Sequence, residues 1–173
     1  VIEKVSKQKE EVVIKKDSLV VKEGEKILEV GCGTGLFSDL FGDDYVGIDF
    51  FDRFVKKARE KNPEVKFEVM DATKMNFEGG SFDKVLLFCF LHHMDDSQFD
   101  KVMKKVLDIS KKVYVMELVP QKYNFIARVL YWLDRGYNIR EFSVLKDKLE
   151  EYGKVTRYHM FRSFIYKMVM VEV

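Results

Sequence analysis

Three glycines in alternate positions follow an apolar run near the start of the chain. The run Ile27–Val30 leads into Gly31-Cys32-Gly33-Thr34-Gly35, and a second apolar run, Tyr45–Ile48, ends in Asp49. Glycine is needed where the backbone turns at positive φ or lies directly against a ligand, because a Cβ would fill that space. A carboxylate at the end of the next strand can accept hydrogen bonds from a ribose diol. The spacing therefore predicts a nucleoside site at the strand ends of an α/β fold.

The glycine spacing also limits which nucleoside ligands the predicted site can bind. A dinucleotide loop has the pattern G-x-G-x-x-G, whereas this chain has G-x-G-x-G, with Leu36 where the last glycine would stand. No Lys-Ser or Lys-Thr pair follows, as a P-loop requires. Glu29, just ahead of the loop, would repel a pyrophosphate and suit an ammonium or sulfonium group. We therefore expect a nucleoside with a positively charged, amino-acid-like tail.

With these residues the chain resembles the class I S-adenosylmethionine-dependent methyltransferases. Residues 29–35 match the family's first motif, and Asp49 matches the acidic residue of its second strand. Asp71 stands at the third-strand position that commonly meets the adenine amino group, and residues 82–93 match the fourth-strand motif. The resemblance covers residues 19–120 by motifs and the remainder by topology. It implies an α/β fold with a Rossmann-like, seven-stranded, mostly parallel sheet, a C-terminal antiparallel hairpin and helices on both faces.

The resemblance implies S-adenosylmethionine as cofactor, with S-adenosylhomocysteine as its product. Residues 88–91 lack the Asn-Pro-Pro-Tyr signature of amino-group methylation on bases and glutamines, and the Pro-Cys nucleophile of cytosine-C5 enzymes is absent. The sequence there is similar to the small-molecule group that includes quinone-ring and lipid methyltransferases, so we expect a small apolar or aromatic acceptor. The matching positions that imply cofactor contacts are Glu29, Gly31, Cys32, Gly33, Gly35, Asp49, Phe50, Asp71, Ala72 and Phe88.

Two adjacent histidines, His92 and His93, follow the fourth strand near the expected position of the methyl group. Either one could act as a general base for an acceptor that must lose a proton early, such as a phenol or an activated carbon. Alternatively, both histidines only pack or position the acceptor. Adjacent side chains at a strand end point in different directions, and Asp95 and Asp96 suit helix capping, so we expect no metal site here.

Residues 120–140 form an unusually long connection that is rich in large side chains. The segment leaves the fifth strand at the carboxyl end, where ligands bind in open α/β sheets. We therefore expect a lid or substrate insertion, although a helix packed on the core or a homodimer contact would show the same pattern. An amphipathic lid could also touch a membrane that carries a lipid substrate. The substrate-side candidates are Tyr123, Tyr131, Trp132, Tyr137 and Arg140.

Composition limits the number of domains, the possible partners and the location that we expect for this chain. With 173 residues, of which 47% are hydrophobic, the chain can bury one sizeable core, so we expect a single domain over residues 1–173. The net charge of +1 gives no global attraction to nucleic acid or to an anionic membrane. Cys32 and Cys89 are isolated, which argues against a disulfide framework or zinc site. We find no apolar run of about 20 residues and no secretion pattern, and expect a cytoplasmic monomer or homodimer without stable membrane insertion.

Alternating apolar runs and helical patterns predict right-handed crossovers and a parallel sheet. Residues 1–18 are expected to be an N-terminal helical segment. The expected strands cover residues 27–30, 45–49, 65–70, 84–90 and 112–118, followed by two closing strands at 154–161 and 166–173 that pair as an antiparallel hairpin. The expected helices begin at Leu36 and end at Phe41, begin after a cap at Asp52 and end at Asn62, and cover residues 96–109 and 144–152.

Two other functions remain in competition with methyl transfer. A catalytically inactive S-adenosylmethionine-binding fold could serve as a partner or regulatory subunit. An NAD-dependent oxidoreductase is disfavoured by the glycine spacing and by Glu29.

Overall fold

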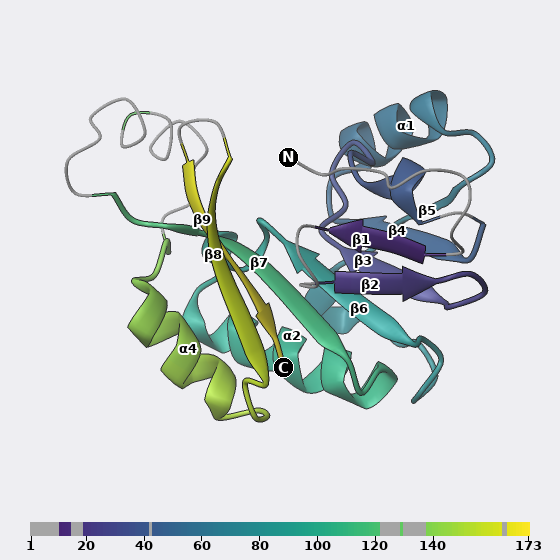
Figure 1. Cartoon of the computed structure of the whole chain (residues 1–173). Helices are drawn as coiled ribbons and strands as arrows, with labels where there is room; N and C mark the ends of the chain where they lie inside the picture. Colours follow the sequence, from purple (N-terminus) through teal and green to yellow (C-terminus); the bar gives the residue numbers. More distant parts are fainter. Residues whose placement is uncertain (1–10, 15–18, 42, 122–128, 130–137, 164–165) are drawn as a thin grey trace.

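The computed structural model describes residues 11–14, 19–41, 43–121, 129, 138–163 and 166–173. Its main feature is a seven-stranded mixed sheet in the order β5-β4-β3-β6-β7-β9-β8, beside a separate two-stranded sheet, β1-β2 (Figure 1). The strands are β1 Glu11–Ile14, β2 Leu19–Lys22, β3 Ile27–Val30, β4 Tyr45–Asp49, β5 Lys66–Val69, β6 Lys84–Phe88, β7 Val113–Val119, β8 Arg157–Ser163 and β9 Tyr166–Glu172. The helices are α1 Asp52–Lys61, α2 Asp96–Ile109 and α4 Phe142–Glu150, with short 3-10 turns η1 Ser38–Leu40, η2 Ala72–Lys74 and η3 Leu91–His93.

Strands β5, β4, β3, β6 and β7 run parallel, while β9 pairs antiparallel with both β7 and β8. This arrangement confirms the expected seven-stranded mixed sheet and its C-terminal hairpin. Every residue of β6 and β7 is buried, because both faces of a central parallel strand are covered. All five parallel strands therefore end at one edge of the sheet, where the predicted site residues follow β3, β4, β5 and β6.

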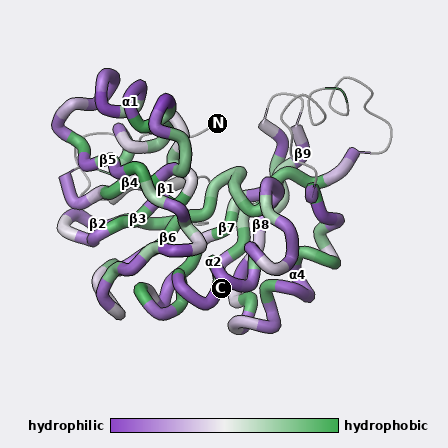
Figure 2. Tube along the Cα trace, turned by 180° about the vertical axis from the view of Figure 1, so that it is seen from behind, coloured by the Kyte–Doolittle hydropathy of each residue, from purple (hydrophilic) through white to green (hydrophobic). Residues whose placement is uncertain are grey.

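The sheet separates two apolar layers. On one face, Val55 and Ala58 of α1 pack together with Leu19 and Val21 of β2. On the opposite face, α2 and α4 supply buried side chains such as Phe99 and Leu149. Helices therefore cover both faces, as expected. Figure 2 shows apolar colouring along the central strands and alternating hydrophilic and hydrophobic stretches on α1.

The prediction of a helix near the N-terminus is wrong for the part that the structure describes. Glu11–Ile14 is strand β1, which pairs antiparallel with β2. Three consecutive β-branched residues, Val12, Val13 and Ile14, favour a strand, because branching at Cβ restricts the side chain in a helix. Residues 1–10 and 15–18 lie outside the described part of the chain, and the domain division stays a prediction.

Two smaller predictions about helix starts are also corrected. The helix expected over residues 36–41 is only the 3-10 turn η1, where the Ser38 hydroxyl donates to the Gly35 carbonyl and competes with regular helical bonding. Asp52 is the first residue of α1 and not its cap, because the helical bonds begin at the Phe51 carbonyl. By contrast, α2 has its predicted bounds, and Asp95 caps it through a bond from the Gln98 amide.

The tight packing of β4 against β5 and the glycine loop generates a stability prediction. A Cβ at Gly47 would lie 2.7 Å from Cδ1 of Phe67 and 2.9 Å from Sγ of Cys32, both in buried residues. Overpacking of this kind typically costs about 1 to 3 kcal/mol. We expect Gly47→Ala to lower the free energy of unfolding in urea by this amount. In Gly79→Ala the new Cβ meets its nearest atom at 3.6 Å, so this control should remain within about 0.5 kcal/mol of the wild type. Equal stability of both variants would contradict the packing argument.

Candidate functional site

The glycine loop is tied to the end of the neighbouring strand β4. The amides of Gly31 and Cys32 donate to the carbonyl of Ile48 at 2.8 and 2.9 Å, and the Gly33 amide donates to Oδ2 of Asp49 at 3.0 Å. The three loop glycines have φ angles of +77°, +54° and +70°, which side chains rarely adopt. The structure therefore brings the loop and Asp49 together, as their predicted roles require.

The three glycines serve different purposes. A Cβ at Gly31 would collide with the ring of Phe90, and a Cβ at Gly35 would lie 2.8 Å from Cζ of Phe67. These two glycines are needed for the packing of the protein itself. A Cβ at Gly33 would meet nothing within 4 Å, so the bare backbone there borders open space beside Asp49. Gly33 is the position where a ligand can lie directly against the loop.

The half-buried Asp49 carboxylate anchors two backbone segments. Its Oδ2 accepts from Gly33, and its Oδ1 accepts from the amide of Phe51 at 2.9 Å. A carboxylate offers about four lone-pair sites, so two further donors, such as a ribose diol, can still bind. Phe50 comes next in the chain and is 65% exposed, which leaves an aromatic ring open at the same edge. The arrangement fits the predicted nucleoside site.

Asp71 and Ala72 follow β5 at the same edge of the sheet. Oδ1 of Asp71 accepts from the Thr73 hydroxyl at 2.7 Å and from the Thr73 amide at 2.9 Å. The hydroxyl bond is the largest cause that lowers the pKa of Asp71. The carboxylate thus caps the turn η2, with Lys74 3.4 Å from its other oxygen, while Ala72 is buried. Their expected contacts with adenine stay predictions.

Glu29 lies deeper than the sequence suggested. Its side chain is 1% exposed, and the hydroxyl of Tyr45 donates to it at 2.5 Å. Burial raises the pKa of Glu29 from 4.5 to about 8, against the lowering effect of the Tyr45 bond and with a smaller raising effect from the charge of Asp49. Burial also raises the pKa of the Cys32 thiol, which makes it a poor nucleophile. The expected pairing of Glu29 with a cationic ligand group stays a prediction.

Phe88, the last predicted cofactor contact, is 3% exposed at the end of β6. Its ring packs edge-on against Phe37 at a centroid distance of 5.1 Å. The structure therefore shows Phe88 as part of the core beneath the loop, and its contact with a cofactor stays a prediction.

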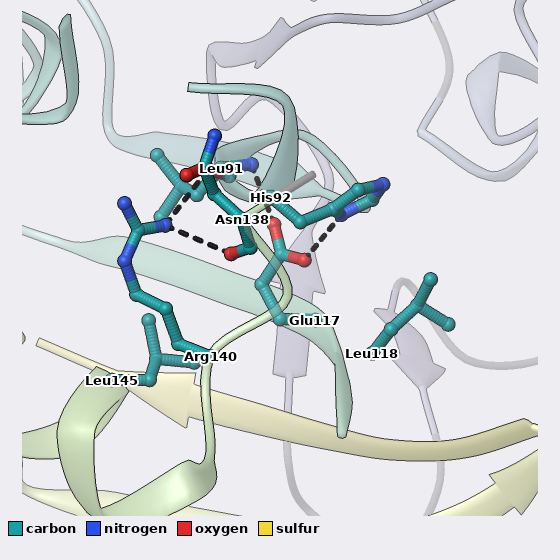
Figure 3. Close-up of a pocket in the computed structure, with 7 residues that line it drawn as sticks. All are labelled: Leu91, His92, Glu117, Leu118, Asn138, Arg140 and Leu145. Carbon is teal, nitrogen blue, oxygen red and sulfur yellow. Dashed lines mark hydrogen bonds and ion pairs between the residues drawn. The ribbon is translucent and has the colours of Figure 1, made fainter. Parts of the chain in front are cut away.

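The loop after β6 is held by a residue that sequence reasoning missed. Oε1 of Glu117, on β7, accepts from the amides of Phe90 at 2.9 Å and Leu91 at 2.5 Å, while its Oε2 lies 2.6 Å from Nδ1 of His92 (Figure 3). Cys89 just before this loop has a φ of +51°, a left-handed conformation that is unfavourable for a side chain. The sequence feature that could have identified Glu117 is its charge, because it is the lone carboxylate in the otherwise uncharged, wholly buried strand β7.

The two histidines lie in the 3-10 turn η3 with their rings close together, which differs from the expectation that they point in different directions. His92 is buried against Glu117, whereas His93 is exposed, and their ring centroids are 4.1 Å apart. Among the described residues, no group of three or more His, Cys, Asp or Glu side chains is placed to hold a metal ion. Glu117 therefore fixes the orientation of the His92 ring after β6.

Arg140 lies beside this loop, with its guanidinium bound to the protein. Its nitrogens donate to the carbonyls of Leu91, Asn138 and Met94 at 3.1 to 3.2 Å and to Oδ1 of Asp96 at 2.9 Å. The Asn138 amide in turn donates to the His92 carbonyl at 3.0 Å. These bonds fasten residues 138–140 to η3, and an acceptor contact for Arg140 stays a prediction.

A small cavity adjoins Arg140. Its volume is about 10 Å³, which is room for about one water molecule and not for an organic acceptor. The residues that line it are Leu91, His92, Glu117, Leu118, Asn138, Arg140 and Leu145 (Figure 3). The other substrate-side candidates, Tyr123, Tyr131, Trp132 and Tyr137, lie outside the described residues. Within the described ranges, no helix is long and apolar enough to cross a membrane.

The raised pKa of Glu29 generates a prediction about stability. Between about pH 4.5 and pH 8 the folded protein holds a proton that the unfolded chain has released, so raising the pH in this window costs stability. The cost approaches about 1.4 kcal/mol per pH unit. We expect the stability of the wild type relative to Glu29→Gln to fall by roughly this slope in urea unfolding from pH 5 to pH 8. Glu60→Gln, on the exposed surface of α1, should run parallel to the wild type. A parallel Glu29→Gln profile would contradict the assignment.

Comparison with known proteins agrees with this geometry. Residues 27–112 match the family model described as a methyltransferase domain. A demethylmenaquinone methyltransferase from Beutenbergia cavernae is 38% identical over 74 residues, which cover 41% of this chain and 31% of that protein. Phosphoethanolamine N-methyltransferase 3 from Arabidopsis thaliana is 29% identical over 147 residues, covering 79% of this chain and 30% of its own length. The chain thus spans about a third of the length of these curated relatives.

Solved structures show the same fold. An S-adenosylmethionine-dependent methyltransferase from Methanosarcina mazei has a TM-score of 0.73 and 18% identity, with 88% of this chain and 93% of that one covered. The magnesium protoporphyrin IX methyltransferase from Synechocystis PCC 6803, solved with bound S-adenosylhomocysteine, has a TM-score of 0.64 and 18% identity, with 86% and 73% covered. Taken with the family model and the order of the motifs at the strand ends, these matches show that the chain belongs to the class I S-adenosylmethionine-dependent methyltransferase family.

Proposed function

We propose that this protein binds S-adenosylmethionine at the carboxyl edge of its sheet and transfers the methyl group to a small apolar or aromatic acceptor. The observation that carries the proposal is the open backbone at Gly33, bonded to the Asp49 carboxylate. A bare glycine beside a carboxylate with acceptor sites to spare fits a ribose. Residues that follow β5 and β6 complete the same edge.

The residues present fit the cofactor's parts. Asp49 would hold the ribose hydroxyls, Phe50 and Asp71 would flank the adenine, and the loop at Gly33 would support the amino-acid tail. When bound, the cofactor supplies an electrophilic methyl group on a sulfonium. The protein's own task is then to align and desolvate the acceptor, and alignment alone can contribute roughly 7 to 11 kcal/mol.

Support for an aromatic acceptor comes from the relatives and from the second half of the site. The matched relatives include methyltransferases named for demethylmenaquinone and for 2-methyl-6-phytyl-1,4-hydroquinone, and the latter is 37% identical over 92 residues. An acceptor that must lose a proton needs a general base, and a buried histidine with a carboxylate bonded to one ring nitrogen is a residue of that kind. We also propose that the protein is cytoplasmic and that it is a monomer or a homodimer.

Cofactor binding is tested by thermal shift with S-adenosylhomocysteine. At 100 times its Kd the ligand should stabilise the wild type by about 2.7 kcal/mol, and NAD should give no shift. Asp49→Ala should weaken binding by about 1.5 to 3 kcal/mol, the range for hydrogen bonds to a charged group. Asp52→Ala, three residues further on and exposed, should bind like the wild type. No response of the wild type to S-adenosylhomocysteine would overturn the proposed function.

Turnover separates an enzyme from an inactive binding fold. We expect methyl transfer from labelled S-adenosylmethionine to at least one member of a panel of phenols and hydroquinones, and a lower rate with alkyl amines. Asp49→Ala should lose activity in proportion to its loss of cofactor affinity when the cofactor is below its Kd. Cofactor binding without transfer to any phenol, hydroquinone or amine would instead support the partner or regulatory subunit.

A further inference from the structure

Strand β8 is the last strand on its side of the sheet, beyond β9 (Figure 1). In the described part of the chain it pairs with β9 alone, so its outer edge meets no other strand there. An unpaired edge presents amide and carbonyl groups that can pair with another chain, and proteins usually protect such edges. The opposite edge strand, β5, is protected, because it has only four residues, of which Lys66 and Glu68 form an ion pair at 2.9 Å.

The backbone groups that face outward from β8 are those of Tyr158, Met160 and Arg162. Val113 and Val173 exchange both of their backbone hydrogen bonds, at 3.4 and 3.0 Å. Because antiparallel strands alternate between bonded and non-bonded pairs, the odd-numbered residues of β9 bond to β7 and its even-numbered residues bond to β8. The β8 residues opposite those even-numbered positions are Arg157, His159, Phe161 and Ser163. The three residues between them therefore direct their amides and carbonyls to the outer edge.

The side chains of the same three residues are also exposed. Tyr158 is 53% exposed, Met160 is 36% exposed, and Arg162 is exposed as well. The ring of Tyr158 lies 4.9 Å from that of Phe142, so the start of α4 supports it beside the edge. Between Arg157 and Arg162 the strand contains no lysine, carboxylate or proline. The centre of β8 therefore lacks the residues that commonly prevent the pairing of strand edges.

We propose that this edge is a homodimer interface, in which β8 pairs antiparallel with β8 of a second copy about a two-fold axis at Met160. Pairing of this kind is isologous, which is the commonest arrangement in homo-oligomers. Each of the three outward-facing residues exchanges two backbone hydrogen bonds with the partner strand. The two seven-stranded sheets then form one continuous sheet across the axis.

The sequence of β8 is complementary to itself in this register. Tyr158 lies opposite the partner's Arg162, and Arg162 lies opposite the partner's Tyr158, so each guanidinium meets an aromatic ring on the same face of the sheet. An axis at Arg162 would instead place two guanidinium groups opposite each other, which is destabilising. The register centred on Met160 also overlaps the two strands along all seven residues of β8. Charge and overlap therefore both favour this register and a second copy as the partner.

Sedimentation equilibrium measures the proposed dimer. At micromolar concentration the wild type should have twice the mass of one chain. Met160→Lys places two ammonium groups opposite each other at the axis and should weaken the dimer by about 100-fold or more. Because the Met160 side chain is exposed and its amide does not bond to β9, the variant should keep the circular dichroism spectrum of the wild type. Val69→Lys, at an apolar residue that is 47% exposed on the opposite edge strand, should remain dimeric.

Disulfide trapping tests the register. In Met160→Cys the two Cα atoms at the axis should be about 5.5 Å apart, a distance that a disulfide can span, so diamide should link the two chains. Tyr158→Cys and Arg162→Cys should be linked to each other when the two variants are mixed, because these positions are opposed. Neither variant should be linked when it is treated alone. Val69→Cys, on the opposite edge strand, should give no linked dimer.

The outcomes that contradict the proposal are distinct. A monomeric wild type would overturn it, and so would a dimer that Met160→Lys leaves intact, because its interface would lie elsewhere. Equal linking of Tyr158→Cys alone and in the mixture would overturn the register. If Met160→Lys unfolds, the mass of the wild type and the thiol pairs still decide the proposal. The proposed methyl transfer can fail without affecting this inference, because β6, β7 and β9 separate β8 from β3 and its glycine loop.

Discussion

The hydrogen bonds between the glycine loop and β4 are the interaction on which the carboxyl edge of β3 and β4 depends. Ile48 accepts the amides of Gly31 and Cys32, and Asp49 accepts the amide of Gly33. These bonds form only because β3 and β4 run parallel in one register, with Val30 opposite Ile48. The loop's positive φ angles, the open space at Gly33 and the orientation of Asp49 all follow from this one alignment.

A second alignment organises the loop after β6. In the β6–β7 register Phe88 lies opposite Met116, so Glu117 comes level with the start of the loop that follows β6. Its carboxylate meets the amides of Phe90 and Leu91 where they leave the strand. Arg140 then binds the far side of the same loop through the carbonyls of Leu91 and Met94. The loop is thus held from β7 and from the end of the long connection.

Sequence patterns predicted the fold and the meeting of the glycine loop with Asp49 at the edge of the sheet, because those signals are local. Apolar runs that end in glycine or a carboxylate identified β3 and β4, and the spacing of apolar side chains gave α2 its bounds. The Glu117–His92 pair is different, because it depends on strand register across 25 residues of chain. Arg140 was predicted as a substrate-side candidate, but its bonds to the loop after β6 could not be predicted, because most of its partners are backbone carbonyls, which carry no residue signature. At Glu11–Ile14, approximate helical spacing competed with β-branching, and pairing with β2 favoured the strand.

The left-handed backbone of Cys89 has a consequence for how this loop can vary among related proteins. A side chain in that conformation costs roughly 1 to 2 kcal/mol, and the bonds that Glu117 makes to the next two amides offset it. Without the carboxylate, the strained turn would lose part of what holds it. Positions 89, 92 and 117 are therefore coupled, because a change at one of them alters what the other two contribute to the stability of the loop. Loss of the histidine alone would leave Glu117 its two amide bonds and the turn its support, whereas loss of the carboxylate would leave the histidine and the turn without their shared partner.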